Sequence, residues 1–289
     1  MHPADLKTRI FLDSGDPNET REIIKLLGFL DGQTTNPTLI SKNPDSEKRL
    51  QMGKKFNRDE IFNFYNKVVK ELSELMPQGS ISIEVYADSK TTVEEMIQQG
   101  RKMFKWIPNA HIKYPTTRAG LEAANQSIRE GLKVNMTLCF NQEQAAAVYA
   151  ATKGAKKGDV YVSPFVGRLD DIGINGMDLI KNIIQMYKNG DGHVEVLTAS
   201  VRNMDHLLYA LKHDSDIITA PFSILKQWAE MPIMKTGKDF DYSPANLAPI
   251  QYQNLNMDQD WHKFNISHQL TDIGIQKFSQ DWNNLLITA

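Results

Sequence analysis

The feature that most constrains this chain is an alternation of short apolar, β-branched segments with longer segments of helical periodicity. Eight segments have the length and composition of strands: 9–13, 32–35, 81–86, 110–114, 133–140, 160–165, 194–199 and 216–220. Helical segments lie between them, and another follows the last strand. Strands that alternate with helices pair in parallel through right-handed crossovers. We therefore predict an α/β fold, a closed (β/α)8 TIM barrel, with a doubly wound open sheet as the alternative.

The length of 289 residues suits one such barrel, so we expect a single domain over 1–289. Residues 236–268 show neither period and carry Pro, Asn and Asp, which predicts a loop-like insertion. That insertion could recruit a partner protein or be an ordinary surface excursion. Residues 269–289 predict a C-terminal helix. Its apolar face is expected to comprise Ile273, Phe278, Trp282 and either Leu285 or Leu286.

Composition narrows the class of protein. The formal net charge of -2 gives no sign of a nucleic-acid or anionic-membrane surface. The single cysteine, Cys139, excludes an intrachain disulfide and is expected to be a core thiol in a reducing compartment. The N-terminus has no apolar signal core, and no apolar run reaches about 18 residues. We expect a soluble cytoplasmic protein. The seven histidines lack metal-ligand spacing, so no metal site is expected.

Polar side chains occur where the predicted strands end. In a (β/α)8 barrel, functional groups gather at the C-terminal ends of the strands and in the loops that follow. The polar residues at those positions are Asp13, Asn36, Glu84, Lys113, Asn135, Thr137, Ser163, Arg168, Ser200 and Arg202. Each could be structural alone, but together they predict a site at this end of the barrel.

Lys113 is the candidate nucleophile of this set. Partial desolvation would lower its pKa and let the amine attack a carbonyl, which an always-protonated arginine cannot do. The alternative is a solvated lysine beyond the strand. Asp13 is a candidate general base, or else a cap of the loop 14–19.

Glu84 and the pair Asn135 and Thr137 lie within strands rather than after them. Strand alternation sets Glu84 apart from the apolar face, and a mid-strand glutamate is costly unless it is paired or faces a polar barrel mouth. A salt bridge inside the barrel is the alternative. Asn135 and Thr137 lie on one face of their strand. The alternative for this pair is a hydrogen bond between the two side chains in the core.

Two arginines follow the sixth and seventh strands, each with a serine nearby. Arg168 and Arg202 would suit a phosphate, because guanidinium binds phosphate in a bidentate way and barrels often hold phosphate near the last strands. The alternative is a pair of surface arginines bridged to carboxylates such as Asp170 and Asp171.

Six motifs of this chain resemble those of the transaldolase family, in the family's order and spacing. They are "LDGQTTNPTLI" (30–40), "SIEV" (82–85), "IKYPTT" (112–117), "VNMTLCF" (134–140), "YVSPFVGRLDDIG" (161–173) and "ASVRN" (199–203). The later "LTDIGIQKFSQDW" (270–282) resembles the ending of the smaller bacterial and archaeal members. The resemblance runs from residue 9 to about residue 230.

The resemblance implies a class I, Schiff-base mechanism on sugar phosphates, without metal or cofactor, in a homo-oligomer. Lys113 matches the lysine that forms the imine, and Asp13 matches the acid–base aspartate. Glu84 and Thr137 match the residues that hold a catalytic water. The residues implied in substrate binding are Asn36 and Asn135 for donor hydroxyls, Ser163 in support, Phe165 as a closing aromatic, and Arg168, Ser200 and Arg202 for phosphate.

Two rival functions stay open. A fructose 6-phosphate aldolase, which releases free dihydroxyacetone, resembles this family but carries Gln and Tyr where this chain has Glu84 and Phe165. A sugar-phosphate-binding barrel without catalysis is the second rival. The chain also departs from the family pattern at Tyr86 and Tyr114, where smaller or apolar residues are expected beside the catalytic positions. The insertion 236–268 is longer than in small members, whose final helix packs on a neighbouring subunit.

Overall fold

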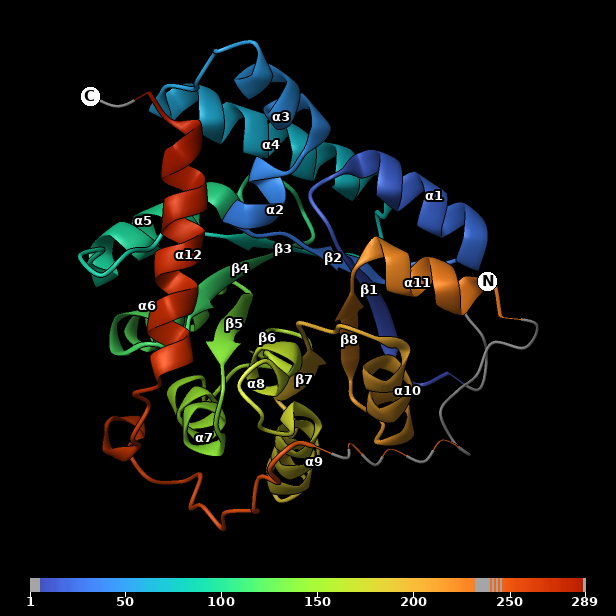
Figure 1. Cartoon of the computed structure of the whole chain (residues 1–289). Helices are drawn as coiled ribbons and strands as arrows, with labels where there is room; N and C mark the ends of the chain where they lie inside the picture. Colours follow the sequence, from blue (N-terminus) through green and yellow to red (C-terminus); the bar gives the residue numbers. More distant parts are fainter. Residues whose placement is uncertain (1–5, 232–239, 241, 243, 245, 288–289) are drawn as a thin grey trace.

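A computed structural model describes residues 6–231, 240, 242, 244 and 246–287 of the chain. Its centre is a closed barrel in which each strand pairs in parallel with the next, and the last with the first (Figure 1). The strands are β1 (Arg9–Asp13), β2 (Gly32–Thr34), β3 (Ser80–Glu84), β4 (Ala110–Pro115), β5 (Val134–Cys139), β6 (Val160–Pro164), β7 (Val194–Thr198) and β8 (Ile217–Ala220). The predicted TIM barrel is confirmed, and the open sheet is excluded.

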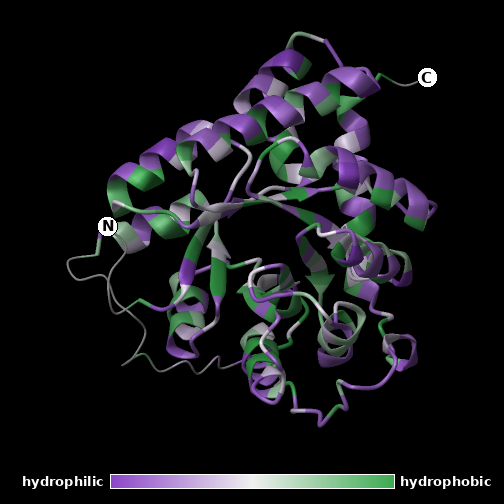
Figure 2. Cartoon of the chain, turned by 180° about the vertical axis from the view of Figure 1, so that it is seen from behind, coloured by the Kyte–Doolittle hydropathy of each residue, from purple (hydrophilic) through white to green (hydrophobic). Residues whose placement is uncertain are grey.

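Helices surround the barrel and cover its outer face (Figure 1). They are α1 (Pro17–Leu27), α2 (Pro37–Ser41), α3 (Pro44–Gln51), α4 (Arg58–Leu75), α5 (Val93–Phe104), α6 (Arg118–Arg129), α7 (Gln142–Ala151), α8 (Val166–Asp170), α9 (Gly176–Tyr187), α10 (Met204–Lys212), α11 (Phe222–Ala229) and α12 (Gln269–Leu285). Seen from behind, most of the helices mix hydrophilic and hydrophobic residues, as expected for elements with one buried face (Figure 2). No described helix is long and apolar enough to cross a membrane.

Three short helices, α2, α3 and α8, were not predicted. The first two begin with an asparagine cap followed by proline: Asn36 accepts from the Leu39 amide (2.9 Å), and Asn43 accepts from the Asp45 amide (2.9 Å). An N-cap asparagine with proline at N1 is a start signal that the sequence does contain. Helices of five to eight residues are too short to show a clear hydrophobic period, which is the main sequence signal for a helix.

The register of the central strands sets the height of the polar side chains. Glu84 of β3 pairs with Lys113 of β4, which pairs with Asn135 of β5, so these three lie at one level of the barrel. Thr137 lies one layer nearer the mouth, beside Pro115. Residues that alternate with them pack against the helices. Parallel pairing therefore converts sequence spacing into one polar cluster.

The C-terminal helix α12 runs beside α2 and across the end of β5, so it covers part of the barrel mouth (Figure 1). Phe278, Trp282 and Leu285 are buried as predicted, but Ile273 is 47% exposed, which corrects the predicted apolar face. The buried face of α12 is centred on Gly274 and Phe278, so Gly274 rather than Ile273 faces the barrel. The helical period of 3.6 residues does not decide which of two adjacent residues is buried.

Residues 246–268 are irregular except for one 3₁₀ turn, Trp261–Lys263. Within the predicted insertion, residues 236–239, 241, 243 and 245 lie outside the described residues, as do 288–289 at the end of the predicted C-terminal helix. The described part is mostly hydrophilic (Figure 2). It is tied to the helical layer where the Gln142 side chain donates to the Gln253 carbonyl (3.1 Å).

Candidate active site

A cavity of about 440 Å³ opens at the C-terminal ends of the strands. Eight of the residues singled out from the sequence line it: Asp13, Asn36, Lys113, Ser163, Phe165, Arg168, Ser200 and Arg202. The other three, Glu84, Asn135 and Thr137, do not line the cavity but are buried on the strands beside Lys113. These eleven residues come from seven strands, β1 to β7, or from the loops that follow them, and they converge on one place.

Lys113 lies inside the barrel with 3% of its surface exposed, so the solvated-lysine alternative is wrong. Its Nζ lies 2.9 Å from Glu84 Oε2 and donates to the Thr35 carbonyl at 3.0 Å. A buried amine is costly unless it is paired, and these two contacts provide the pairing. They also hold the amine at the floor of the cavity.

Asp13 ends β1 and faces the same cavity. The Thr34 hydroxyl donates to Asp13 Oδ1 (2.7 Å) and lies 2.6 Å from the Thr219 hydroxyl, which orients the carboxylate. The loop that follows is capped by Asp16, whose carboxylate accepts from the Asn18 amide, so capping is not the role of Asp13.

Both carboxylates near the amine have perturbed titration. Burial raises the pKa of Asp13 above its ordinary value, although the positive charge of Lys113 and the Thr34 hydroxyl oppose the shift. Burial raises the pKa of Glu84 in the same way, again against Lys113. Carboxyl groups with raised pKa values can exchange protons nearer neutral pH, as general acid–base catalysis requires.

Asn135 and Thr137 do not pair with each other. The Asn135 amide donates to Ser82 Oγ (3.0 Å) and accepts from Ser163 Oγ (2.6 Å), a chain across three strands. The Thr137 hydroxyl is fully buried and makes no hydrogen bond to any described residue. Such a hydroxyl can bind a water or a substrate group.

Asn36 lines the cavity and also begins α2. Its side-chain oxygen accepts from the Leu39 amide, whereas its amide nitrogen makes no hydrogen bond to any described residue and can donate to a ligand. The side chain is 7% exposed, and the helix cap fixes its orientation.

The two predicted phosphate-binding arginines differ. Arg202 is about half exposed and pairs with Asp171 (3.0 Å), as the surface alternative supposed. Arg168 makes no hydrogen bond or ion pair with any described residue. Its Cζ lies over the rings of Phe165 and Phe278, 5.3 Å from each centroid. Burial, together with the charge of Arg202, lowers the pKa of Arg168, although Glu84, Asp171 and Asp281 oppose the shift.

The loops that carry these arginines are joined by their backbones. The Gly167 amide donates to the Ser200 carbonyl (3.0 Å), and Ser200 adopts a left-handed conformation with φ 59°. A serine in this region of the map is uncommon, and such conformations concentrate at functional sites. The joined loops bring Ser200 to the cavity wall beside Arg168.

A family model described as "Transaldolase/Fructose-6-phosphate aldolase" matches residues 10–289. The chain belongs to this family. Probable transaldolases are similar over most of their length. That of Dehalococcoides mccartyi is 37% identical, with 79% of this chain and 94% of the relative covered. That of Thermoanaerobacter sp. is 35% identical, with 95% and 96% covered. A solved enolase protein from the Sargasso Sea environmental genome shares the fold alone, with TM-score 0.50, 8% identity, and 81% of this chain and 60% of that one covered.

The departures from the transaldolase pattern do not face the cavity. Tyr114 is fully buried on the outer side of β4, where its hydroxyl lies 3.0 Å from Ser127 Oγ of α6. The Tyr86 hydroxyl donates to Asp88 (3.0 Å) and accepts from Asn283 (3.1 Å). Neither residue lines the site. Cys139 is a buried core thiol as predicted, and burial raises its pKa to about 12.

Several lining residues were not predicted for this transaldolase-family site. They are Thr34, Thr38, Lys42, Thr219, Lys277 and Phe278. Thr34 and Thr38 lie inside the motif 30–40, and Lys277 and Phe278 lie inside the motif 270–282. The sequence does not indicate that α12 docks at the cavity. The lining contains five basic side chains (Lys42, Lys113, Arg168, Arg202 and Lys277) and one carboxylate, Asp13. Such a balance favours anionic ligands. No group of three potential metal-ligating side chains occurs among the described residues.

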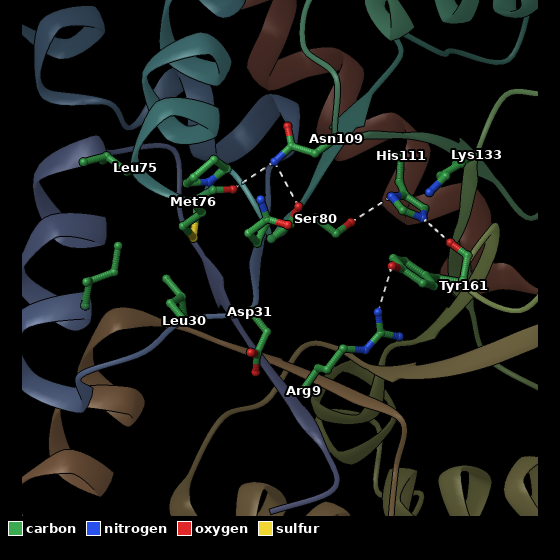
Figure 3. Close-up of a pocket in the computed structure, with 15 residues that line it drawn as sticks. Arg9, Leu30, Asp31, Leu75, Met76, Ser80, Asn109, His111, Lys133 and Tyr161 are labelled. Atoms are coloured by element: carbon green, nitrogen blue, oxygen red, sulfur yellow. Dashed lines mark hydrogen bonds between the residues drawn. The ribbon is translucent and has the colours of Figure 1, made fainter. Parts of the chain in front are cut away.

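A second cavity, of about 510 Å³, lies at the opposite end of the barrel (Figure 3). The His111 ring lies 2.8 Å from Ser80 Oγ and 2.9 Å from the Gly158 carbonyl, and it stacks on Tyr161 with centroids 4.1 Å apart. Arg9 donates to the Tyr161 hydroxyl (3.2 Å) and pairs with Glu195 (2.8 Å). These side chains bind one another, so the described residues at this end offer no candidate for catalysis comparable with Lys113 and Asp13.

Proposed function

We propose that this chain is a transaldolase, a class I enzyme that moves a dihydroxyacetone unit between sugar phosphates. The reaction converts sedoheptulose 7-phosphate and glyceraldehyde 3-phosphate to erythrose 4-phosphate and fructose 6-phosphate, a step of the pentose phosphate pathway. The observation that carries this proposal is the buried Lys113 amine, held 2.9 Å from Glu84 at the floor of a basic cavity. Family membership supports it.

The reaction would begin at the amine. Proton transfer to the Glu84 carboxylate leaves Lys113 neutral, and its lone pair attacks the C2 carbonyl of the ketose phosphate. Loss of water gives a cationic imine. This imine accepts the electron pair released when the C3–C4 bond breaks, which forms an enamine and stabilises the developing carbanion.

Asp13 would act on the C4 hydroxyl. Its carboxylate takes the hydroxyl proton as C3–C4 breaks, and the aldose phosphate departs with a new C=O bond. The enamine carbon then attacks the aldehyde of the acceptor, and Asp13 returns the proton to the new hydroxyl. The orientation given by Thr34 supports this role, because the carboxylate is fixed before the substrate arrives.

A water held by Glu84 and Thr137 would carry protons during imine formation and hydrolysis. The buried Thr137 hydroxyl, which has no described protein partner, supports this assignment. Asn36 and Asn135 would bind donor hydroxyls, with Ser163 holding the Asn135 amide through their 2.6 Å contact. Phe165 would close the cavity.

Arg168, Ser200 and Arg202 would bind the phosphate and so set the distance from phosphate to reacting carbon. The Arg168 guanidinium contacts two rings but makes no hydrogen bond or ion pair with any described residue, which supports its availability to an anion. Arg202 would be the outer contact, since Asp171 already engages it.

The test is borohydride trapping with fructose 6-phosphate, followed by mass analysis of the peptide that contains Lys113. We expect a reduced three-carbon or hexose phosphate adduct on that residue. No adduct would favour a sugar-phosphate-binding barrel without catalysis.

A second assay separates the transferase from the related aldolase. Enzyme is incubated with fructose 6-phosphate, with and without erythrose 4-phosphate. We expect sedoheptulose 7-phosphate with the acceptor and little free dihydroxyacetone without it. Rapid release of dihydroxyacetone would instead identify a fructose 6-phosphate aldolase.

A further inference from the structure

The helix α12 contacts the candidate phosphate-binding residue Arg168. Phe278, 5% exposed, presents its ring to the Arg168 guanidinium with 5.3 Å between Cζ and the ring centroid. Phe165 presents a second ring at the same distance. A cation over a ring face is attracted to it, so the two rings hold the guanidinium without occupying its N–H donors. Those donors stay free for an anion.

Gly274 lies one helical turn before Phe278 and allows α12 to approach this closely. A Cβ atom at position 274 would lie 2.7 Å from Arg168 Nη1 and 2.5 Å from Leu138 Cδ2. Contacts under about 3 Å force something to move, and the end of a long side chain is the easiest group to displace. The helix, the guanidinium and the end of β5 are therefore packed together at this residue.

Both sides of the mouth anchor α12. At its start, Thr271 Oγ1 donates to the Leu138 carbonyl (3.0 Å) and accepts from Gln144 (2.9 Å). Nearer its end, Asp281 accepts from the Thr38 hydroxyl of α2 and pairs with Lys277. These intrachain contacts hold the helix over the cavity.

We propose that α12, through Phe278 and Gly274, positions the Arg168 guanidinium for the substrate phosphate and so sets the preference for phosphorylated sugars. This inference rests on the proposed function for its substrate class. Phe278 is a positioning residue, which acts through Arg168. Its ring contacts the Arg168 guanidinium directly.

The first test compares Phe278→Leu, which keeps the apolar volume but removes the ring, with Phe278→Tyr, which keeps the ring. Binding of inorganic phosphate is measured by calorimetry on the full chain. We expect about tenfold weaker binding for Phe278→Leu and recovery toward wild type for Phe278→Tyr. The ratio of kcat/KM for fructose 6-phosphate to that for free fructose should fall by a similar factor in Phe278→Leu.

The second test uses Gly274→Ala, with Ile273→Ala as the matched control on the same helix. Ile273 is 47% exposed and points away from the cavity. We expect Gly274→Ala to weaken phosphate binding about tenfold, because the new methyl displaces Arg168, and Ile273→Ala to bind phosphate as wild type does.

Two results would overturn the inference. One is phosphate affinity equal to wild type in both Phe278→Leu and Gly274→Ala. The other is an equal loss of kcat/KM for phosphorylated and free sugar, which would mark α12 as merely structural. The calorimetric measurement does not depend on turnover. Failure of borohydride trapping on the wild-type chain would therefore contradict the proposed function and leave the phosphate result to decide this inference separately.

Discussion

At the N-terminal end of the barrel, the Tyr161 ring contacts both Arg9 and His111. At the C-terminal end, Arg168 and Thr137 make no side-chain hydrogen bond or ion pair with any described residue. The two ends contain similar kinds of polar side chain beside cavities of similar size. Their difference lies in whether donors and acceptors are already used. A paired network stabilises the fold, while unused polar groups and buried charges are costly and persist where chemistry needs them.

The largest expected effect is at Lys113. Lys113→Arg keeps a positive charge beside Glu84 but cannot form an imine, so kcat should fall at least about 10³-fold and borohydride trapping should vanish. Lys133→Arg, at the opposite end, is the matched control and should keep wild-type kcat. Substantial transfer by Lys113→Arg would break the comparison, because it would move the chemistry elsewhere.

Asp13 comes next. Asp13→Asn should lower kcat by about 10²-fold, because the C4 proton loses its acceptor. It should also raise the free energy of unfolding at neutral pH by roughly 1 kcal/mol, since burial of the charged form is unfavourable.

The pH dependence of that stability gain has a defined sign. The native pKa of Asp13 is raised, so the native state holds its proton longer than the unfolded state does. The gain of Asp13→Asn should be absent below the ordinary aspartate pKa, grow as pH rises through the native pKa, and then stay constant. Urea unfolding of both proteins at several pH values measures it. A variant less stable than wild type at neutral pH would contradict the idea that this end costs stability.

A smaller effect separates the two arginines. Arg168→Ala should raise KM for fructose 6-phosphate about 30-fold, and Arg202→Ala only about threefold, because Arg202 is exposed and already paired with Asp171. Steady-state kinetics with phosphorylated and free sugar checks this, and only the phosphorylated sugar should respond. Equal effects of the two variants would show that burial does not decide the contribution of each arginine.

The smallest effect on activity is expected at His111. His111→Ala should leave kcat and KM within about twofold of wild type, yet lower the free energy of unfolding by about 3 kcal/mol, through the cavity and the unpaired Ser80 and Gly158 groups. Urea unfolding and steady-state kinetics on the same preparation give both numbers.

His111 also predicts a pH effect on stability. Burial lowers the pKa of His111 to about 3, whereas the ordinary value is 6.5. The unfolded chain therefore binds a proton that the native state does not, and wild-type stability should fall as pH drops from about 6.5 toward 3. The fall should be smaller in His111→Ala. If His111→Ala lost as much activity as Asp13→Asn, the N-terminal end of the barrel would also take part in catalysis, and the proposed difference between the two ends would be wrong.

Much of the fold could be predicted from the sequence, because each strand is short, β-branched and followed by a helical period. The candidate site was predictable for the same reason: parallel strands bring residues such as Glu84 and Lys113, 29 positions apart, to one level. The contribution of α12 was not predictable. The hydrophobic pattern of α12 indicates that one face is buried but not which part of the barrel that face contacts. Packing against the barrel decides that Gly274, and not its neighbour Ile273, is buried.

The oxygen and the nitrogen of the Asn36 side-chain amide have different roles, and this affects how substitutions at Asn36 are interpreted. One end of its amide is committed to the first turn of α2, and the other end faces the cavity. Asn36→Ala would remove both the N-cap of α2 and a contact to the ligand. A loss of kcat in that variant would therefore not show which of the two interactions matters. Asn36→Asp would preserve the cap while replacing an N–H donor by an acceptor. Asn36→Asp therefore tests the ligand contact of this side chain without removing the helix cap.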